Sequence, residues 1–381
     1  MNWKPAFALV LLYVTLVTYV GAIVFEKNKE NKRLIGWVFA LLSLAPLLVI
    51  KYYHFINESV TWGLETIGLH FSLPGLNLAI PVGLSFFTFQ AAGYMFDVYR
   101  GQISAERNLI DYILFVSFFP QIAAGPISKA SELLPQIKNP HTFQYERAKQ
   151  GLKFLLWGMF LKVVMADRLG LFVDTVYANY QNYNGTTCFV ASVLYSVQIY
   201  CDFSGYSLMA IGVARILGFD LINNFRRPYF AVSITDFWRR WHISLTRWLT
   251  QNIYIPLGGS RCHKMKCYLN ILVTFLVSGL WHGAAWTFVL WGGIHGVAQI
   301  IEKQLNRTKY QGDSAFVRGT RILITFIIVT FAWVFFRSPN ISTAFSFMGH
   351  IFTSIGIPHV SEMGGVGLSI SAISLVIIIC L

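Results

Sequence analysis

Residues 269–301 read LNILVTFLVSGLWHGAAWTFVLWGGIHGVAQII, and this apolar run contains no Asp, Glu, Lys or Arg before Glu302. As one straight helix the run would be roughly 50 Å long, whereas the hydrocarbon core of a membrane is about 30 Å thick. We therefore expect the run to be broken at Gly279 and Gly283, the glycines that flank His282. Burying an ionisable side chain at membrane depth is energetically unfavourable, so those that occur there usually have a function. His282 is therefore a candidate functional residue.

The whole composition is typical of a membrane protein. Hydrophobic residues make up 55% of the 381 residues and charged residues only 12%, and the mean hydropathy is +0.55, far from the profile of soluble proteins. The predicted fold is an all-α polytopic membrane protein with about ten transmembrane or re-entrant helices. The net charge of +13 indicates cytoplasmic loops and an anionic ligand or lipid rather than nucleic acid.

Apolar segments and basic loops predict a topology. The candidate spans are residues 6–25, 34–50, 78–96, 152–166, 187–201, 206–218, 269–301, 322–336 and 368–381. The loop 26–33 carries four basic residues and is expected in the cytoplasm, while the connection 51–77 is poor in Lys and Arg and is expected outside. Residues 6–25 lack a cleavage site and are expected to remain as a span. The chain ends inside an apolar run, so we expect a single domain over 1–381 that either is incomplete at its C-terminus or lacks a final helix.

Two segments do not fit a simple alternation of spans. Residues 110–127 are interrupted by Pro120 and Pro126 and have basic residues on both flanks, so we expect a re-entrant or interfacial segment. The run 269–301 also has basic residues on both sides, which predicts a helical hairpin or two broken helices with both ends in the cytoplasm. His282 would then lie at the turn, deep in the membrane.

The five cysteines show no spacing typical of disulfide-rich secreted domains. Cys262, His263 and Cys267 are spaced as in some zinc sites, but they supply only three ligands, on a flexible basic loop. We therefore expect no metal site and interpret the thiols as free and cytoplasmic.

A second informative stretch, residues 224–261, reads NFRRPYFAVSITDFWRRWHISLTRWLTQNIYIPLGGSR. Ser233 and Asp236 have the spacing of a capping box, which predicts a helix over 236–250. Its pattern of tryptophans and arginines is typical of an amphipathic helix at the membrane interface, with the arginines at the headgroups. That interpretation does not explain why His242 falls at the apolar border, so His242 is a second candidate functional residue.

The two histidines are stronger candidates together than apart. Taken alone, each is more often a hydrogen-bonded core residue than a catalytic one. Together, His282 and His242 suit a nucleophile-activating site, in which one imidazole is the base and a second polar group orients the substrate. His295 lies on the same apolar run and is interpreted as structural or as part of a tunnel lining.

Basic side chains near these histidines are candidates for binding an anionic donor. The loop GGSR at 258–261 is glycine-rich but lacks the G-x-x-x-x-G-K spacing of a nucleotide-binding P-loop. It is suited to the phosphates of a thioester carrier, and contact with lipid phosphate is an equal alternative. Arg239, Arg240 and Arg261 are the candidate donor-binding residues.

Several motifs together resemble those of the membrane-bound O-acyltransferase family. They are WHG at 281–283, DFWRRWHISL at 236–245, PVGLSFFTFQ at 81–90, DVYRG at 97–101, PQIAAGP at 120–126, YCDFSGYS at 200–207 and FAWVFFR at 331–337. The resemblance covers roughly residues 78–340 and is nearest to the bacterial branch that O-acetylates alginate, peptidoglycan and other polysaccharides. One departure is Leu208, where that branch is expected to have an aspartate.

The resemblance implies that His282 is the catalytic histidine and His242 the second polar residue of the active site. It also implies a central tunnel near mid-membrane, with the acyl thioester entering from the cytoplasm. The implied activity is transfer of an acetyl group from acetyl-CoA, a substrate rather than a permanently bound cofactor, for O-acetylation of a cell-surface polysaccharide. The implied acceptor is an extracytoplasmic SGNH-hydrolase-like acetyltransferase or the polysaccharide itself, and the implied location is the bacterial cytoplasmic membrane.

Three other functions remain open at this point. The first is D-alanyl transfer to teichoic acid from a carrier protein, which mass analysis of the transferred group would distinguish. The second is a transporter or flippase of an acylated carrier, which would release no free CoA. The third is a structural scaffold for polysaccharide export, in which substitution of either histidine would be silent.

Overall fold

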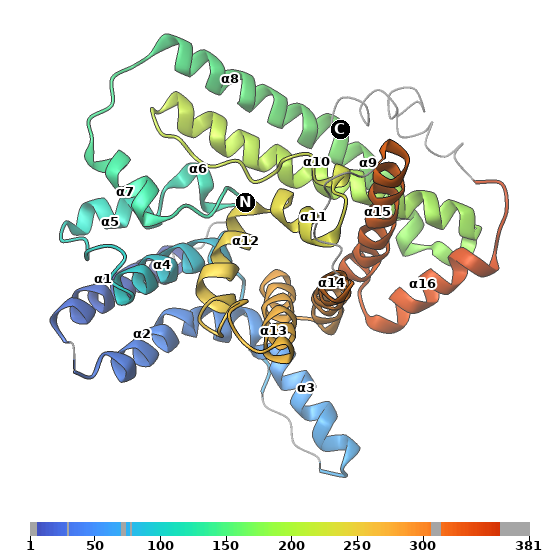
Figure 1. Ribbon diagram of the computed structural model, residues 1–381, viewed down its shortest axis with the longest axis horizontal. Helices are drawn as coiled ribbons and strands as arrows, with labels where there is room; N and C mark the ends of the chain where they lie inside the picture. The colour runs from blue at the N-terminus through green and yellow to red at the C-terminus, as the bar shows by residue number, and fades with distance from the viewer. Residues whose placement is uncertain (1–5, 29, 70–73, 77, 306–313, 359–381) are drawn as a thin grey trace. The chain divides into compact units, whose positions relative to one another are not determined.

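The computed structural model describes residues 6–28, 30–69, 74–76, 78–305 and 314–358. Every secondary-structure element in these ranges is a helix, as predicted for the all-α class (Figure 1). The helices fall into two compact units, one formed by residues 1–149 with 213–222 and one by residues 150–212 with 223–381. This division does not test the expected single domain, which stays a prediction.

The first unit is built around three apolar helices. Its elements are α1 (Ala6–Lys27), α2 (Lys32–Leu47), the π-helical turn η1 (Leu48–Tyr52), α3 (Tyr53–Thr66), α4 (Leu84–Tyr99), α5 (Leu109–Val116), α6 (Phe119–Ile122) and α7 (Ala130–Lys138). Helix α1 packs against both α2 and α4. The packing is close because Gly21 of α1 has no side chain: a Cβ there would lie 2.8 Å from the ring of Phe39 and 3.1 Å from the Sδ of Met95.

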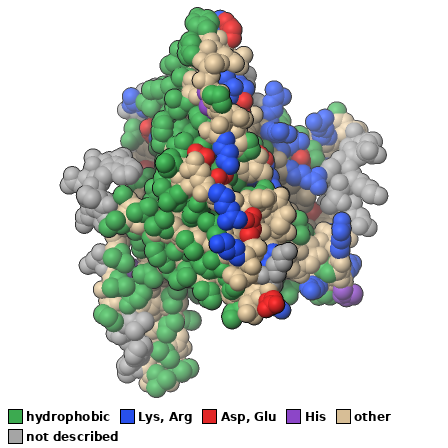
Figure 2. Space-filling view, turned by 90° about the vertical axis from the view of Figure 1, so that its left-hand side faces the viewer, with side chains coloured by type: hydrophobic (Ala, Val, Ile, Leu, Met, Phe, Trp, Pro, Cys, Tyr) green, Lys and Arg blue, Asp and Glu red, His purple; other side chains and the backbone are tan. Residues whose placement is uncertain are grey.

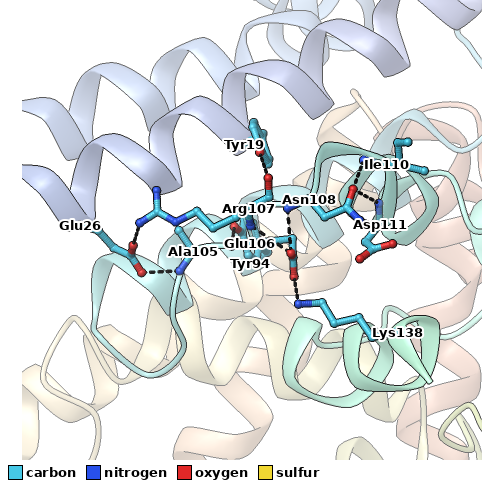
Figure 3. A network of polar contacts seen from close by, with 10 residues as sticks. All are labelled: Tyr19, Glu26, Tyr94, Ala105, Glu106, Arg107, Asn108, Ile110, Asp111 and Lys138. Atoms are coloured by element: carbon cyan, nitrogen blue, oxygen red, sulfur yellow. Dashed lines mark hydrogen bonds and ion pairs between the residues drawn. The ribbon is translucent and has the colours of Figure 1, made fainter.

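A polar network lies where the loop between α4 and α5 meets α7 (Figure 3). The buried carboxylate of Glu106 accepts the backbone N–H groups of Arg107 and Asn108, each at 3.0 Å. Its second oxygen lies 2.6 Å from the Nζ of Lys138. The backbone N–H of Glu106 in turn donates to the hydroxyl of Tyr94 at 2.8 Å. The network therefore satisfies a buried charge with one ammonium and two backbone donors.

In the first unit, some helices begin or end at residues other than those predicted. The predicted outer connection 51–77 is largely helical, because α2, η1 and α3 continue from Lys32 to Thr66. Pro46 does not end this helix, since the wider π-helical turn follows directly after it. The predicted interruption of 110–127 is present as the gap between α5 and α6, while its re-entrant or interfacial location stays a prediction.

The second unit contains the remaining helices. They are α8 (Tyr145–Met159), which begins in the first unit, η2 (Phe160–Ala166), α9 (Asp167–Ala178), η3 (Tyr180–Asn182), α10 (Gly185–Ile216), η4 (Pro228–Phe230), α11 (Ile234–Arg240), α12 (Ile243–Leu249), η5 (Thr250–Tyr254), α13 (Lys264–His282), α14 (Trp286–Gln304), α15 (Ala315–Arg337) and α16 (Ile341–Thr353). Its core is aromatic. Trp241, Trp291 and Trp333 are fully buried, and the indole rings of Trp291 and Trp333 stack with their centroids 5.5 Å apart. These large rings join α14 and α15 to the chain that follows α11.

Helix α10 is one continuous helix, so the prediction of two spans at 187–201 and 206–218 is wrong. Gly205 does not break it, because this glycine is where α8 approaches α10. A Cβ on Gly205 would lie 2.8 Å from the carbonyl oxygen of Gly158, and a Cβ on Gly212 would lie 2.6 Å from that of Gly151. Small residues of this kind let membrane helices pack backbone to backbone.

The apolar run 269–301 is broken as predicted. Helix α13 ends at His282, and α14 begins at Trp286 and returns beside it (Figure 1). The two helices touch at their glycines: a Cβ on Gly279 would lie 2.1 Å from the carbonyl oxygen of Phe288. The run therefore forms a helical hairpin with His282 next to the turn.

The surface agrees with a membrane location. Three of the described helices are long and apolar enough to cross a membrane, namely residues 7–27, 32–66 and 315–337. Large hydrophobic side chains are widely exposed, which is unusual for a soluble protein. Figure 2 shows hydrophobic side chains over much of the face drawn. The count of about ten spans and the central tunnel stay predictions, and the span 368–381 lies outside the described residues.

Candidate active site

The stretch that carries His242 is not one helix, so the prediction of a helix over 236–250 is wrong. Ser233 caps α11 as predicted, since its Oγ accepts the backbone N–H of Asp236 at 3.0 Å. Helix α11 then ends because Trp241 is extended and His242 adopts a left-handed φ of 45°. Helix α12 begins directly after His242, so this imidazole lies at a sharp bend between two short helices.

Asn224 stabilises this bend. Its backbone carbonyl accepts the N–H of Ile243 at 3.0 Å, and its side-chain Oδ1 accepts the N–H of Ser244 at 3.1 Å. These are among the first N–H groups of α12, which have no partner inside that helix. A left-handed residue other than glycine costs about 1–2 kcal/mol, and the two bonds from buried Asn224 offset that cost. Sequence patterns do not reveal such a non-local contact.

The two candidate histidines lie next to each other. The ring centroids of His242 and His282 are 6.4 Å apart. The ring of Trp281 packs against both, with its centroid 5.7 Å from that of His242 and 4.9 Å from that of His282. The bend before α12 and the end of α13 thus bring together two imidazoles from separate segments of the second unit, and their role in one site stays a prediction.

The two histidines differ in how far their side chains are exposed. His242 is fully buried, with the ring of Phe203 at 4.6 Å. His282 is half-buried, and the rings of Trp291 and Phe336 lie 5.1 and 5.2 Å from it. His282 is therefore the more exposed of the two residues, although the Nε2 of its ring is itself buried.

A cavity of about 470 Å³ lies beside α13, within the second unit. It is lined from α11 by Thr235, Trp238 and Arg239, from α12 and η5 by Thr246, Leu249, Thr250 and Tyr254, from the following loop by Ser260, from α13 by Ile271, Thr274, Phe275 and Ser278, and from α14 by Gln299 and Lys303. Ser278 precedes His282 by one turn of α13, a rise of about 6 Å. The cavity thus has two cationic side chains in its lining and extends to within one helical turn of His282.

Of the three arginines predicted to bind the donor, the structure places Arg239 in the lining of this cavity. Arg240 instead forms an ion pair with Asp236, with its Nε 2.9 Å from the carboxylate. Arg261 lies in the exposed loop before α13 and is not among the lining residues. Arg239 is therefore the one of the three that lines the cavity, and donor binding by any of them stays a prediction.

The second cation of the cavity, Lys303, was not among the residues predicted from the sequence, although it lies only two residues after the long apolar run. Its Nζ donates a hydrogen bond to the Sγ of Cys267 at 2.7 Å, and the hydroxyl of Tyr254 lies 3.4 Å from the same sulfur. Burial by itself raises the pKa of the Cys267 thiol, but the bond from Lys303 and the contact with Tyr254 lower it, and the net pKa lies below the ordinary value. A thiol with a lowered pKa and the ammonium group of Lys303 thus lie together beside the cavity.

His295 is a packing residue. It is fully buried, and its Nδ1 accepts a hydrogen bond from the Nε1 of Trp238 at 3.3 Å. Its ring also lies 5.0 Å from that of Trp291. His295 therefore supports Trp238, which lines the cavity, and this agrees with the structural role predicted for it.

The chain is similar in sequence to known proteins over most of its length. Residues 98–342 match the model of the MBOAT, membrane-bound O-acyltransferase family. The chain is 36% identical to the probable alginate O-acetylase AlgI of Pseudomonas syringae pv. tomato, over 96% of this chain and 70% of the relative. It is 35% identical to the peptidoglycan O-acetyltransferase of Helicobacter pylori, over 90% and 69%. The teichoic acid D-alanyltransferase of Bacillus subtilis is 23% identical, over 86% and 84%.

Proposed function

The chain belongs to the membrane-bound O-acyltransferase family and is an O-acyltransferase, and from this we propose that it moves an acetyl group from cytoplasmic acetyl-CoA across the bacterial cytoplasmic membrane for O-acetylation of a cell-surface polysaccharide. The relatives at 35–36% identity support this class of acceptor, because they are named as alginate and peptidoglycan O-acetylating proteins. The observation that carries the proposal is the pair of imidazoles, since the rings of half-buried His282 and fully buried His242 lie 6.4 Å apart.

In the proposed reaction His282 is the general base. Its imidazole takes the proton of the acceptor hydroxyl, and the hydroxyl oxygen attacks the carbonyl carbon of the thioester. The tetrahedral intermediate collapses, the C–S bond breaks, and the leaving CoA thiolate takes the proton back from His282. His242 orients the substrate or stabilises the charge that develops beside it, which suits a buried ring with its centroid 6.4 Å from that of His282.

The cavity beside α13 is the proposed site of the donor. Its volume of about 470 Å³ lies in the usual range for small-molecule sites. Arg239 and Lys303 supply positive charge for the donor's phosphates, while Phe275 and Ile271 supply apolar surface for the thioester arm. Arg240 and Arg261 have no part in this proposal.

The acceptor side of the proposal has two forms. The hydroxyl is either a serine of an extracytoplasmic SGNH-hydrolase-like acetyltransferase or a hydroxyl of the polysaccharide itself. Purified protein incubated with acetyl-CoA and each acceptor in turn distinguishes the two, since mass spectrometry then locates the acetyl group on a serine or on a sugar.

Substitution of the histidines tests the proposed site. In proteoliposomes supplied with radiolabelled acetyl-CoA, His282→Ala should lower acetyl transfer at least about 10²-fold, the lower limit typical of a lost general base. His242→Asn is the sharper second variant, because asparagine tolerates the left-handed backbone and so removes the imidazole without straining the bend. His263→Ala is the control, since this exposed histidine precedes the far end of α13. Full activity of His282→Ala at normal protein levels would contradict the proposal.

A second candidate is D-alanyl transfer to teichoic acid from a carrier protein. It is favoured by the similarity to teichoic acid D-alanyltransferases, at 23–24% identity, although the O-acetylases are more similar. Mass analysis of the transferred group separates an acetyl from a D-alanyl ester. A transporter or flippase differs from both, since purified protein of that kind would release no free thiol from either donor.

A further inference from the structure

Aromatic rings surround the imidazole of His282. The ring centroids of Trp281, Trp291 and Phe336 lie 4.9, 5.1 and 5.2 Å from that of His282, and each ring meets the imidazole at a steep angle, between 71° and 85°. Rings at this spacing and inclination are in edge-to-face contact, which leaves no space for another group between them. The Nε2 of His282 is itself buried. Little room therefore remains beside the imidazole of the proposed general base.

The three rings differ in exposure. Trp281 is 5% exposed and Trp291 is fully buried, whereas Phe336, next to the end of α15, is half-buried. Phe336 also packs against Phe288 of α14, which is half-buried as well, with the ring centroids 4.9 Å apart. The partly open side of His282 is therefore bounded by phenylalanine rings from α14 and α15 rather than by the two indoles.

The direction of the donor follows from the position of the cavity beside α13. On this helix the lining of the cavity ends at Ser278, and His282 lies one turn further toward the hairpin turn. A thioester arm that comes from this cavity reaches His282 with its sulfur on the cavity side. The acyl group extends from the carbonyl carbon away from the sulfur, and so toward the hairpin turn. Phe288 lies there, in the first turn of α14, and Phe336 packs against it.

We propose that Phe336 is a specificity-determining residue, whose ring limits the acyl group beside His282 to the size of acetyl. This inference rests on the proposed function. The acceptor oxygen must lie about 2.6–3.2 Å from the imidazole nitrogen that takes its proton, and the carbonyl carbon about 3–3.5 Å from that oxygen. A methyl group on this carbon already lies close to the Phe336 ring, whose centroid is 5.2 Å from that of the imidazole. A longer acyl group overlaps with the ring.

The test is a competition between two donors of different length. Membrane vesicles that contain the chain receive equal concentrations of acetyl-CoA and propionyl-CoA, and alkali then releases the esterified acids, whatever the acceptor, for counting by mass spectrometry. The wild-type chain should favour acetyl by at least about 10-fold, the lower limit for one additional methylene group in a fitted site. Phe336→Ala should reduce this preference to within a factor of about three of unity, because the lost ring leaves space for the additional carbon. Phe336→Leu, a milder change, should shift it in the same direction.

Two control variants exclude a merely structural effect. Phe335→Ala removes the neighbouring ring of α15, which is buried and lies 5.3 Å from the ring of Phe345, so it should destabilise the protein and keep the wild-type preference. Phe336→Tyr retains a ring and should also keep that preference. The preference does not depend on how much of a variant folds, because both donors compete for the same protein molecules.

The outcomes distinguish this proposal from the proposed function. A wild-type chain that forms no ester from either donor, above the background of vesicles without the chain, would refute the proposed function. A wild-type chain that forms esters without preferring acetyl, or an unchanged preference in Phe336→Ala, would refute the role of Phe336 alone. An equal loss of preference in Phe335→Ala would mean that any disturbance of α15 widens the site, and it would overturn the assignment as well.

Discussion

The side-chain Oδ1 of Asn224 accepts the backbone N–H of Ser244 at 3.1 Å, and this contact holds the chain where His242 turns into the left-handed region. Asn224→Ala leaves that N–H without its partner at the start of α12. We expect it to lower the free energy of unfolding by about 0.5–2 kcal/mol, the range for a lost helix cap. Acetyl transfer should fall more than this instability explains, because the bend places His242. Thermal unfolding in detergent and transfer rates at a low temperature measure the two effects separately.

Asn224→Asp is the control for this prediction, since aspartate keeps the side-chain oxygen that accepts from Ser244. Its activity and melting temperature should lie between those of the wild type and of Asn224→Ala. If both variants were equally impaired, the acceptor bond would not be what holds the bend.

Two neighbouring glycines of α14 should respond differently to the same substitution. A Cβ on Gly292 would lie 2.2 Å from the carbonyl oxygen of Phe275, whereas a Cβ on Gly293 would meet only a side-chain carbon of Leu276, at 3.7 Å. Gly292→Ala must therefore push α13 and α14 apart, and it should lower both the melting temperature and the activity. Gly293→Ala should be as stable as the wild type or slightly more so, because alanine favours a helix. Equal behaviour of the two variants would show that the close approach of the helices is unimportant.

The hairpin of 269–301 could be predicted from the sequence because length and charge alone determine it. A run too long for one membrane crossing, with basic residues at both ends, must turn back, and glycine beside His282 marks the turn. The cap at Ser233 could also be predicted, since a capping box is local in sequence. His242 and His282 could also be named from local patterns, because His282 interrupts an apolar run and His242 falls at the apolar border of an amphipathic stretch.

The features that were missed depend on contacts between distant residues. The end of α11 could not be predicted, because Asn224 provides the bonds that make a left-handed His242 acceptable. The continuity of α10 through Gly205 depends on the backbone of Gly158 on another helix. The position of Lys303 in the cavity lining and its contact with Cys267 become visible only in the folded structure. Propensity and hydrophobic pattern contain none of this information.

The Cys267 thiol should react at a lower pH than an ordinary cysteine. Its pKa lies below the usual value, since Lys303 donates to the sulfur, and the thiolate is the reactive form. Labelling with iodoacetamide over a range of pH, followed by mass spectrometry of the Cys267 peptide, gives the midpoint. Lys303→Met removes the ammonium group and should move that midpoint to higher pH. An unchanged midpoint in Lys303→Met would mean that the ammonium group does not stabilise the thiolate.

Acetyl-CoA should protect Cys267 from the same reagent. Lys303 and Tyr254, which contact the sulfur, both line the cavity proposed for the donor, so a bound donor closes the approach to it. The matched comparison is Cys188, a buried thiol of α10, which lies outside the cavity lining and whose labelling should not depend on acetyl-CoA. Labelling of Cys267 at the same rate with and without saturating acetyl-CoA would argue against a donor in this cavity.

The stability of the first unit should depend on pH through Glu106. Burial by itself raises the pKa of this carboxyl group, but the bonds from Lys138 and from the backbone of Asn108 and Arg107 lower it, and the net pKa lies below the ordinary value. Because the pKa is lower in the folded than in the unfolded state, the carboxylate stabilises the fold above the unfolded value of about 4.3. That stabilisation is lost as the pH falls through the lower folded value. Glu106→Gln should therefore lower the melting temperature at neutral pH and flatten its decline in acid. Melting curves of the two proteins that remained parallel from neutral pH into acid would contradict this role.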